Sequence, residues 1–206
     1  QSQIPTPEAI GLPARVLDLA RADRGLILVT GSKGSGKSTT LASMINWINE
    51  HSAKNIVTLE DPIEYIFESQ KSLIKQREVG RDISSFHESL KHIVRHDPDV
   101  IMVGEMRDPE TMRAALSLAE TGHLVLSTLH TSSAAQTLNR IIDSFPPEQH
   151  AQIRSQLALS LCGIIAQKLV PSQKNDRVAI LEILVNTPAI ARLIREHKLE
   201  QIASVM

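Results

Sequence analysis

The sequence predicts an α/β fold in which helices cover the faces of a largely parallel sheet. Short runs rich in Val, Ile and Leu alternate with longer runs of helical periodicity through most of the chain, which is the pattern of strands joined by helices. The apolar runs are nearly continuous, as expected for strands buried on both faces. The four expected strands are residues 26–30, 55–60, 99–103 and 123–128.

An amphipathic helix is expected directly after the first strand. Beyond Ser38, apolar residues recur at spacings of three and four, which places them on one helical face. They are Leu41, Met44, Ile45 and Ile48.

Two further helices carry end signals. Ser85 is expected to begin one, because Glu88 three residues later completes a capping box. Asp108 is expected to cap the next, with Pro109 in its first turn and Gly122 in a left-handed ending. Their predicted buried stripes are Phe86, Leu90, Ile93 and Val94, and Met112, Ala115, Leu116 and Ala119.

The pattern changes after Ser132. The expected elements there are a helix through residue 142, a helix over 147–161, a hairpin of 163–170 with 177–185, and a last helix from Thr187 and Pro188 toward Met206. The first 24 residues contain three prolines and only a short helical stretch, so we interpret them as a linker.

Composition narrows the classes of function. The chain has 206 residues, of which 42% are hydrophobic, enough for one domain with a sizeable core. Its 22 basic and 23 acidic residues nearly cancel, so no overall attraction to nucleic acid is expected. No apolar run approaches the roughly 20 residues that cross a bilayer, and no secretory signal is visible. We expect a soluble protein that binds no nucleic acid and does not insert into a membrane. A single cysteine, Cys162, offers no internal disulfide and is interpreted as a buried apolar residue.

A glycine-rich segment follows the first strand and opens the first helix. Residues 31–38, Gly-Ser-Lys-Gly-Ser-Gly-Lys-Ser, fit the pattern of a phosphate-binding loop in the context that the pattern requires. Lys37 is expected to reach the β- and γ-phosphates of ATP, and the Ser38 hydroxyl to hold Mg²⁺. Lys33 either contacts phosphate or is solvated. The expected nucleotide-binding residues are Ser32, Lys33, Gly34, Ser35, Gly36, Lys37, Ser38 and Thr39.

Polar residues follow the other expected strands, where ligands of parallel sheets collect. Glu105 follows a strand beside the phosphate strand and is expected to be the general base. The usual strand-end aspartate for magnesium is absent, so Glu60 or a water must complete the metal's shell. Glu60 and Glu64 form an acidic cluster that a cation would neutralise, and a helix-capping turn is the alternative. At the fourth strand, His123 and His130 either sense the γ-phosphate or are structural.

Lys91 and Arg95 lie four residues apart on one expected helix face. A solvated face is the ordinary explanation of such a pair. The alternative is that Arg95 stabilises phosphoryl transfer in a neighbouring subunit, and spacing does not choose between the two.

Together, these segments resemble the type II/IV secretion ATPases, and within them the type IV pilus retraction, or twitching motility, motors. The resemblance runs nearly end to end. It rests on Leu12-Pro13, on residues 34–39, on 59–64 (LEDPIE), on 76–79 (QREV), on 103–108 (VGEMRD), and on 120–123 (ETGH) with 128–131 (TLHT).

The resemblance implies a RecA-like nucleotide-binding core over residues 25–145. It implies that 1–24 is an interdomain linker and that 146–206 is a truncated C-terminal subregion. It further implies a homohexameric ring with ATP and Mg²⁺ between subunits, Glu105 as catalytic glutamate, and His123 and His130 near the γ-phosphate. The implied partner is an inner-membrane pilus platform protein, which would hold a cytoplasmic protein at that membrane. Lys91 stands where family members often carry arginine.

Two features favour pilus retraction over pilus extension. Residues 189–196 resemble the retraction signature AIRNLIRE, differing at Ala191 and Arg192. Extension and type II secretion ATPases commonly insert a four-cysteine zinc module into the hairpin, whereas residues 171–176 form a short link without cysteine. The alternatives are an extension or type II secretion ATPase, a DNA-conjugation motor, and a ring subunit that binds ATP without hydrolysing it. No Asn-Lys-x-Asp segment supports a guanine-nucleotide switch.

Overall fold

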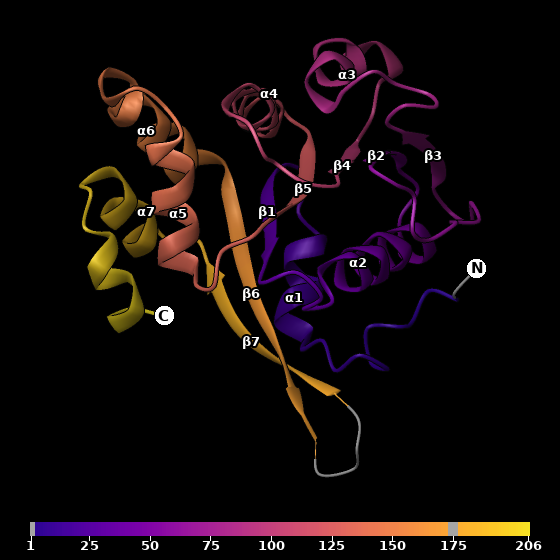
Figure 1. The fold of residues 1–206 in the computed structure, drawn as a ribbon, viewed down its shortest axis with the longest axis horizontal. Helices are drawn as coiled ribbons and strands as arrows, with labels where there is room; N and C mark the ends of the chain where they lie inside the picture. Colours follow the sequence, from indigo (N-terminus) through magenta and orange to yellow (C-terminus); the bar gives the residue numbers. More distant parts are fainter. Residues whose placement is uncertain (1–2, 173–176) are drawn as a thin grey trace.

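The computed structural model describes residues 3–172 and 177–206. In these residues the strands form one sheet of seven in the order β3-β2-β4-β5-β1-β6-β7 (Figure 1). Neighbouring strands are parallel, except that β6 and β7 form an antiparallel hairpin. The strands are β1 Gly25–Thr30, β2 Asn55–Glu60, β3 Leu73–Glu78, β4 Val100–Val103, β5 Leu124–Leu129, β6 Leu161–Pro171 and β7 Arg177–Val185.

Helices cover both faces of this sheet (Figure 1). They are α1 Ala14–Ala20, α2 Lys37–His51, α3 Phe86–His92, α4 Pro109–Glu120, α5 Ala134–Asp143, α6 His150–Ser160 and α7 Pro188–Arg195, with 3-10 turns η1 Ile93–His96, η2 Pro147–Gln149 and η3 Leu199–Ser204. One apolar cluster packs α1 and α2 against the sheet. The other packs α3, α4, α5, α6 and α7 against it. Along β1, Leu26 and Leu28 face one cluster while Ile27 and Val29 face the other. The predicted α/β class is confirmed.

The expected strands are present, with small shifts at the ends of β1, β4 and β5, and the expected hairpin is β6 with β7. Strand β3 was not predicted. Its sequence, LIKQRE, mixes charged with apolar residues, and the strand lies at the open edge of the sheet, where partly exposed side chains are tolerated. The sheet also continues past the expected boundary between residues 145 and 146, because β6 pairs with β1.

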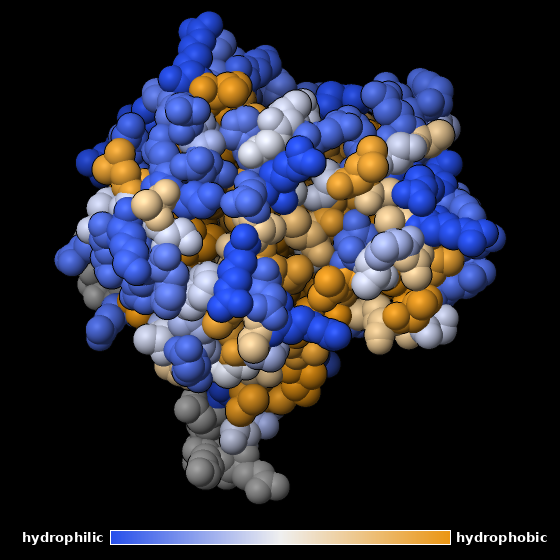
Figure 2. Space-filling model, turned by 180° about the vertical axis from the view of Figure 1, so that it is seen from behind, coloured by the Kyte–Doolittle hydropathy of each residue, from blue (hydrophilic) through white to orange (hydrophobic). Residues whose placement is uncertain are grey.

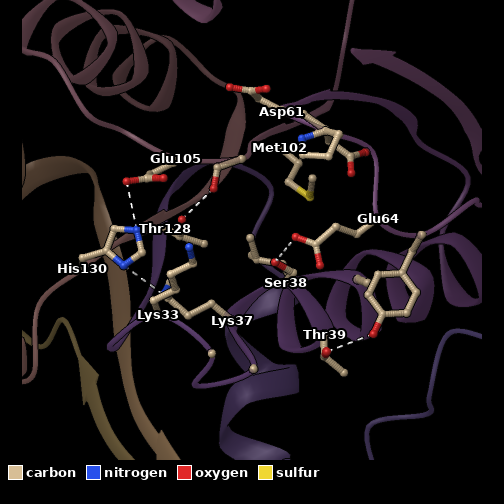
Figure 3. A pocket seen from close by; sticks show the side chains of 18 of the residues that line it. Lys33, Lys37, Ser38, Thr39, Asp61, Glu64, Met102, Glu105, Thr128 and His130 are labelled. Atoms are coloured by element: carbon tan, nitrogen blue, oxygen red, sulfur yellow. Dashed lines mark hydrogen bonds and ion pairs between the residues drawn. The ribbon is translucent and has the colours of Figure 1, made fainter. Parts of the chain in front are cut away.

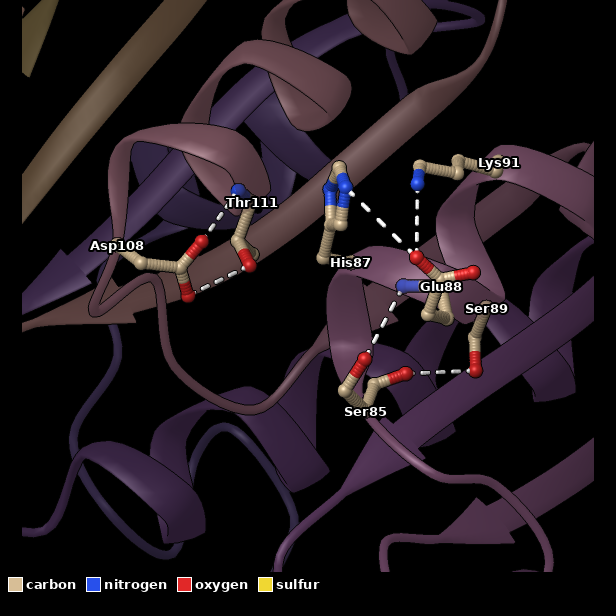
Figure 4. A network of polar contacts seen from close by, with 7 residues as sticks. All are labelled: Ser85, His87, Glu88, Ser89, Lys91, Asp108 and Thr111. Atoms are coloured by element: carbon tan, nitrogen blue, oxygen red, sulfur yellow. Dashed lines mark hydrogen bonds and ion pairs between the residues drawn. The ribbon is translucent and has the colours of Figure 1, made fainter.

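The predicted helix starts are confirmed at Ser85 and Asp108 (Figure 4). The Ser85 hydroxyl oxygen accepts the backbone N–H of Glu88 at 3.2 Å. The Asp108 carboxylate accepts both the N–H of Thr111 at 2.7 Å and its hydroxyl at 2.8 Å. The Glu88 carboxylate pairs with Lys91 at 2.7 Å.

Two helix predictions were wrong in detail. Val94 is 52% exposed rather than buried, because α3 ends at His92 and the tighter turn η1 rotates the following residues away from the apolar stripe. The last helix is not continuous: α7 ends at Arg195, and His197 has a φ of 57°, so the chain resumes as the short turn η3.

The segment before β1 is packed against α2 rather than free. Val16 of α1 is fully buried in the cluster shared with α2. Above it, the guanidinium of Arg21 lies 5.4 Å from the ring centre of Trp47, and the imidazole of His51 stacks on the same indole at 4.5 Å.

The β6–β7 hairpin projects beyond the helices (Figure 1). Its outer strand exposes Val178 and Ile180 by 52% and 58%, and hydrophobic surface gathers on the hairpin when the molecule is seen from behind (Figure 2). The link that closes the hairpin, at residues 173–176, lies outside the described residues. In the part of the chain that the structure describes, no helix has the length and apolar character to span a bilayer.

Candidate functional site

The loop between β1 and α2 has the backbone that a phosphate-binding loop needs. Gly34 and Gly36 have φ values of 78° and 88°, a left-handed conformation that favours glycine. At Gly31, a Cβ would lie only 2.3 Å from the backbone oxygen of Gln167, so no larger residue fits. Helix α2 begins at Lys37, and the positive end of its dipole therefore lies in the loop.

Lys37 is held inside the loop that it belongs to. Its ammonium donates to the backbone oxygens of Gly31 at 2.9 Å and Ser32 at 3.0 Å, and it lies 3.2 Å from Nδ1 of His130 (Figure 3). An ammonium only donates, so Nδ1 accepts in this contact and Nε2 carries the ring proton. Burial lowers the pKa of Lys37, and the nearby Glu105 carboxylate opposes that change.

Glu105 closes a continuous polar chain that starts at Lys37. Its Oε1 lies 3.1 Å from Nε2 of His130 (Figure 3). Its Oε2 lies 2.9 Å from Nε of Arg107. The backbone around it is fixed from β5, because the Thr128 hydroxyl donates to the oxygen of Gly104 at 2.6 Å. Direct contacts thus join the lysine at the start of α2 to the imidazole that follows β5 and to the carboxylate that follows β4.

The acidic residues at the end of β2 and directly after it also lie at the phosphate loop. The Ser38 hydroxyl donates to Oε1 of Glu64 at 2.8 Å. Glu60 is 7% exposed, and its Oε1 accepts from Thr58 at 2.7 Å and from Gln76 at 3.0 Å. Burial raises the pKa of Glu60, and these two hydrogen bonds partly offset the rise.

The oxygen donors here suit a magnesium ion that is shared with phosphates. Among the described residues, no group of three or more His, Cys, Asp or Glu side chains is arranged to hold a metal. Mg²⁺ in nucleotide sites commonly takes one or two protein ligands and completes its shell with phosphate and water. Ser38 and Glu60 line one cavity and fit that role.

A cavity of about 830 Å³ unites these groups, a size that accommodates a nucleotide. Its walls come from the phosphate loop, from the carboxyl ends of β2, β4 and β5, and from the hairpin. The predicted site residues that line it are Lys33, Gly34, Gly36, Lys37, Ser38, Thr39, Glu60, Glu64, Glu105 and His130.

Four predicted residues lie apart from the cavity lining. Ser32 is exposed, although its backbone oxygen accepts a hydrogen bond from Lys37. Ser35 is a buried residue of the loop. His123 precedes β5, so about 20 Å of strand separates it from His130, and its Nδ1 lies 3.2 Å from the backbone oxygen of Leu118. Arg95 is exposed in η1. Within a single chain, neither His123 nor Arg95 reaches the site.

Several residues of the site were not singled out from the sequence. The Tyr65 hydroxyl contacts that of Thr39 at 2.9 Å, Gln76 binds Glu60, and Arg107 binds Glu105. Tyr65 follows the acidic segment, and the other two lie inside quoted motifs, so their positions were a usable signal. Gln167 on β6 had a different signal: it is a polar residue within an apolar strand.

This arrangement defines a structural class: a RecA-like α/β core in which a phosphate-binding loop leaves a central parallel strand and faces a carboxylate and an imidazole from neighbouring strands. The family model described as "Type II/IV secretion system protein" matches residues 12–176, most of the chain. The chain belongs to this family.

Its relatives include pilus motors. It is 50% identical to the type IV pilus retractation ATPase PilT of Pseudomonas aeruginosa, over all of this chain and 60% of that protein. It is 52% identical to the twitching motility protein of Neisseria gonorrhoeae, over 97% of this chain and 54% of that protein. A solved structure of the pilus retraction motor PilT with bound ADP matches with a TM-score of 0.97 at 52% identity, over 100% of this chain and 60% of that chain. The chain therefore spans only part of the length of these relatives.

Proposed function

We propose that this chain is the ATP-hydrolysing core of a motor that powers type IV pilus retraction. The observation that carries the proposal is the contact chain Lys37–His130–Glu105 at the phosphate loop. It links the group suited to hold the terminal phosphate to the group suited to accept a proton. The high identity to proteins named as pilus retraction and twitching motility proteins supports the assignment to retraction.

The loop would bind the phosphates of ATP with its N–H groups and with the Lys37 ammonium. Ser38 and Glu60 would hold Mg²⁺. The ion, when bound, neutralises charge on the phosphate oxygens. Glu64, which accepts from Ser38, would orient that hydroxyl.

Glu105 would act on the attacking water. Its carboxylate would accept a proton as the water oxygen bonds to the γ-phosphorus and the bond to the bridging oxygen breaks, giving ADP and phosphate. His130 and Arg107 hold the two carboxylate oxygens at 3.1 and 2.9 Å, so they would fix the direction in which the base points.

Glu105→Gln tests the chemical step in the full-length protein that contains this chain. The variant should keep MgATP affinity within a few-fold but lose about a hundred-fold or more in kcat, because an amide cannot take the proton. Glu110→Gln, an exposed change on α4, should leave both quantities unchanged. Wild-type turnover by Glu105→Gln would refute the assignment of the base.

We further propose a homohexamer in which a neighbouring subunit completes each site. Arg95 and His123 lie away from the cavity of their own chain, which is compatible with a role in trans. Light scattering should give six times the subunit mass. Mixing inactive Lys37→Ala with inactive Arg95→Ala subunits should restore part of the activity, since a Lys37→Ala neighbour still supplies Arg95. Absence of any recovery in mixed rings would exclude the trans role.

The partner and location follow from the proposed function. A pilus platform protein would hold the motor, a cytoplasmic protein, at the inner membrane. Deleting the gene separates the alternatives: piliated cells that do not move indicate a retraction motor, whereas cells without pili indicate an extension ATPase. Normal pili and movement with a secretion or DNA-transfer defect would refute both pilus roles.

A further inference from the structure

Gln167 joins the hairpin to the phosphate loop through its side-chain amide. The residue lies on β6 and is 5% exposed. Its Nε2 donates to the backbone oxygen of Ser35 at 2.6 Å, and its Oε1 accepts from the hydroxyl of Thr40 at 2.8 Å. One side chain therefore holds both the loop and the first turn of α2.

A side-chain amide suits this bridge because it carries both a donor and an acceptor. A carbonyl oxygen can only accept, so the group facing Ser35 must be the NH₂, which leaves the amide oxygen for the Thr40 hydroxyl. The loop also lies close to Gln167: a Cβ on Gly31 would lie 2.3 Å from its backbone oxygen, and one on Gly36 would lie 3.1 Å from its side-chain Nε2. The loop therefore has no room to shift toward β6.

The hydrogen bond to Ser35 has a consequence for the next residue. In a trans peptide unit, the C=O and the N–H point in opposite directions. Holding the oxygen of Ser35 toward Gln167 directs the N–H of Gly36 away from β6, and Gly36 lines the cavity. We propose that Gln167 is a positioning residue that orients the phosphate loop for nucleotide binding. This inference rests on the proposed function, because it assumes that phosphates bind at the loop.

Two substitutions test the amide in the full-length protein. Gln167→Leu removes both hydrogen bonds. Gln167→Glu retains an acceptor for Thr40 but cannot donate to Ser35 when ionised. Thr40→Val, in contrast, leaves the bond to Ser35 intact. Gln156→Leu is the matched control, because it makes the same chemical change on α6 and removes an amide hydrogen bond to Glu120, away from the cavity.

The measurements are the MgADP dissociation constant by calorimetry, the KM and kcat for ATP, and the melting temperature. Both Gln167 variants should weaken MgADP binding and raise KM by about ten-fold or more, with a smaller change in kcat. Thr40→Val should have a smaller effect on binding, and Gln156→Leu should stay within two-fold of wild type. A residue with only a packing role would lower the melting temperature without weakening MgADP binding and without raising KM more than it changes kcat.

Wild-type MgADP affinity in folded Gln167→Leu or Gln167→Glu protein would overturn the inference. If one variant does not fold, the other decides. Failure of the proposed function gives a different result: a wild-type protein that binds MgADP without hydrolysing ATP refutes hydrolysis, while weaker MgADP binding by the Gln167 variants still supports the positioning role. Absence of MgADP binding in the wild type overturns both.

Discussion

Replacing Gly31 with alanine should destabilise the protein much more than the same change elsewhere. At Gly31 the backbone has a φ of 149°, and the new methyl group would lie 2.3 Å from the oxygen of Gln167 and 2.5 Å from that of the Ser35 side chain. The unfavourable φ contributes about 1–2 kcal/mol, and forcing a methyl into a packed site adds about 1–3 kcal/mol. The sum is about 2–5 kcal/mol of unfolding free energy.

Gly80→Ala is the matched control, because this residue also has a positive φ, 82°, but a Cβ there meets nothing within 4 Å. It should lose only the backbone contribution, about 1–2 kcal/mol. A chain of this size loses about 2–4 °C of melting temperature per kcal/mol, so we expect a fall of about 4–20 °C for Gly31→Ala and about 2–8 °C for Gly80→Ala.

The assay is thermal unfolding of both variants in the full-length protein, followed by MgADP calorimetry below the transition. Gly31→Ala should also weaken MgADP binding, because the methyl displaces the loop, whereas Gly80→Ala should not. Equal losses of melting temperature in the two variants would show that the close approach of β6 to the loop does not exist in solution.

The remaining predictions concern the polar groups of the site. His130→Asn should lower kcat about ten- to a hundred-fold with little change in KM, because it breaks the contact chain between Lys37 and Glu105; steady-state kinetics checks this, and a change in KM alone would contradict it. Glu60→Gln should raise the melting temperature at pH 8 relative to the wild type, because burial disfavours the ionised form of the Glu60 carboxyl and raises its pKa. Because a raised folded-state pKa favours the protonated form, stability from this group is present at low pH and is lost as pH rises through that pKa. The two proteins should therefore converge near pH 4, and a constant difference across pH would refute the assignment.

The fold class could be predicted because its signals are local. Each buried parallel strand is an apolar run, and each confirmed cap lies within three residues of the group that it binds. Strand β3 could not be predicted in the same way, since its residues resemble a surface segment and become a strand only by pairing with β2. The pairing of β6 with β1 joins residues about 135 apart in sequence, and no local pattern reports that.

In the candidate site, too, the local motifs could be predicted and the contacts between distant residues could not. The phosphate loop and the strand-end carboxylates were visible, because a motif and the topology of a parallel sheet are enough to place them. The contacts that connect them were not: Lys37 meets His130 across 93 residues, and Thr40 meets Gln167 across 127. His123 shows this limit most clearly, because it and His130 flank the same strand and therefore lie at opposite ends of β5.

The stack of Arg21, Trp47 and His51 gives this chain an intrinsic optical probe. Trp47 is the sole tryptophan, and it lies on the helix whose first residue is Lys37. A displacement of that helix relative to α1 would change the distance between the indole and its cationic neighbour, and with it the emission of the protein. Nucleotide titrations could thus be followed by fluorescence without attaching a dye, and a Trp47→Phe protein would supply the blank.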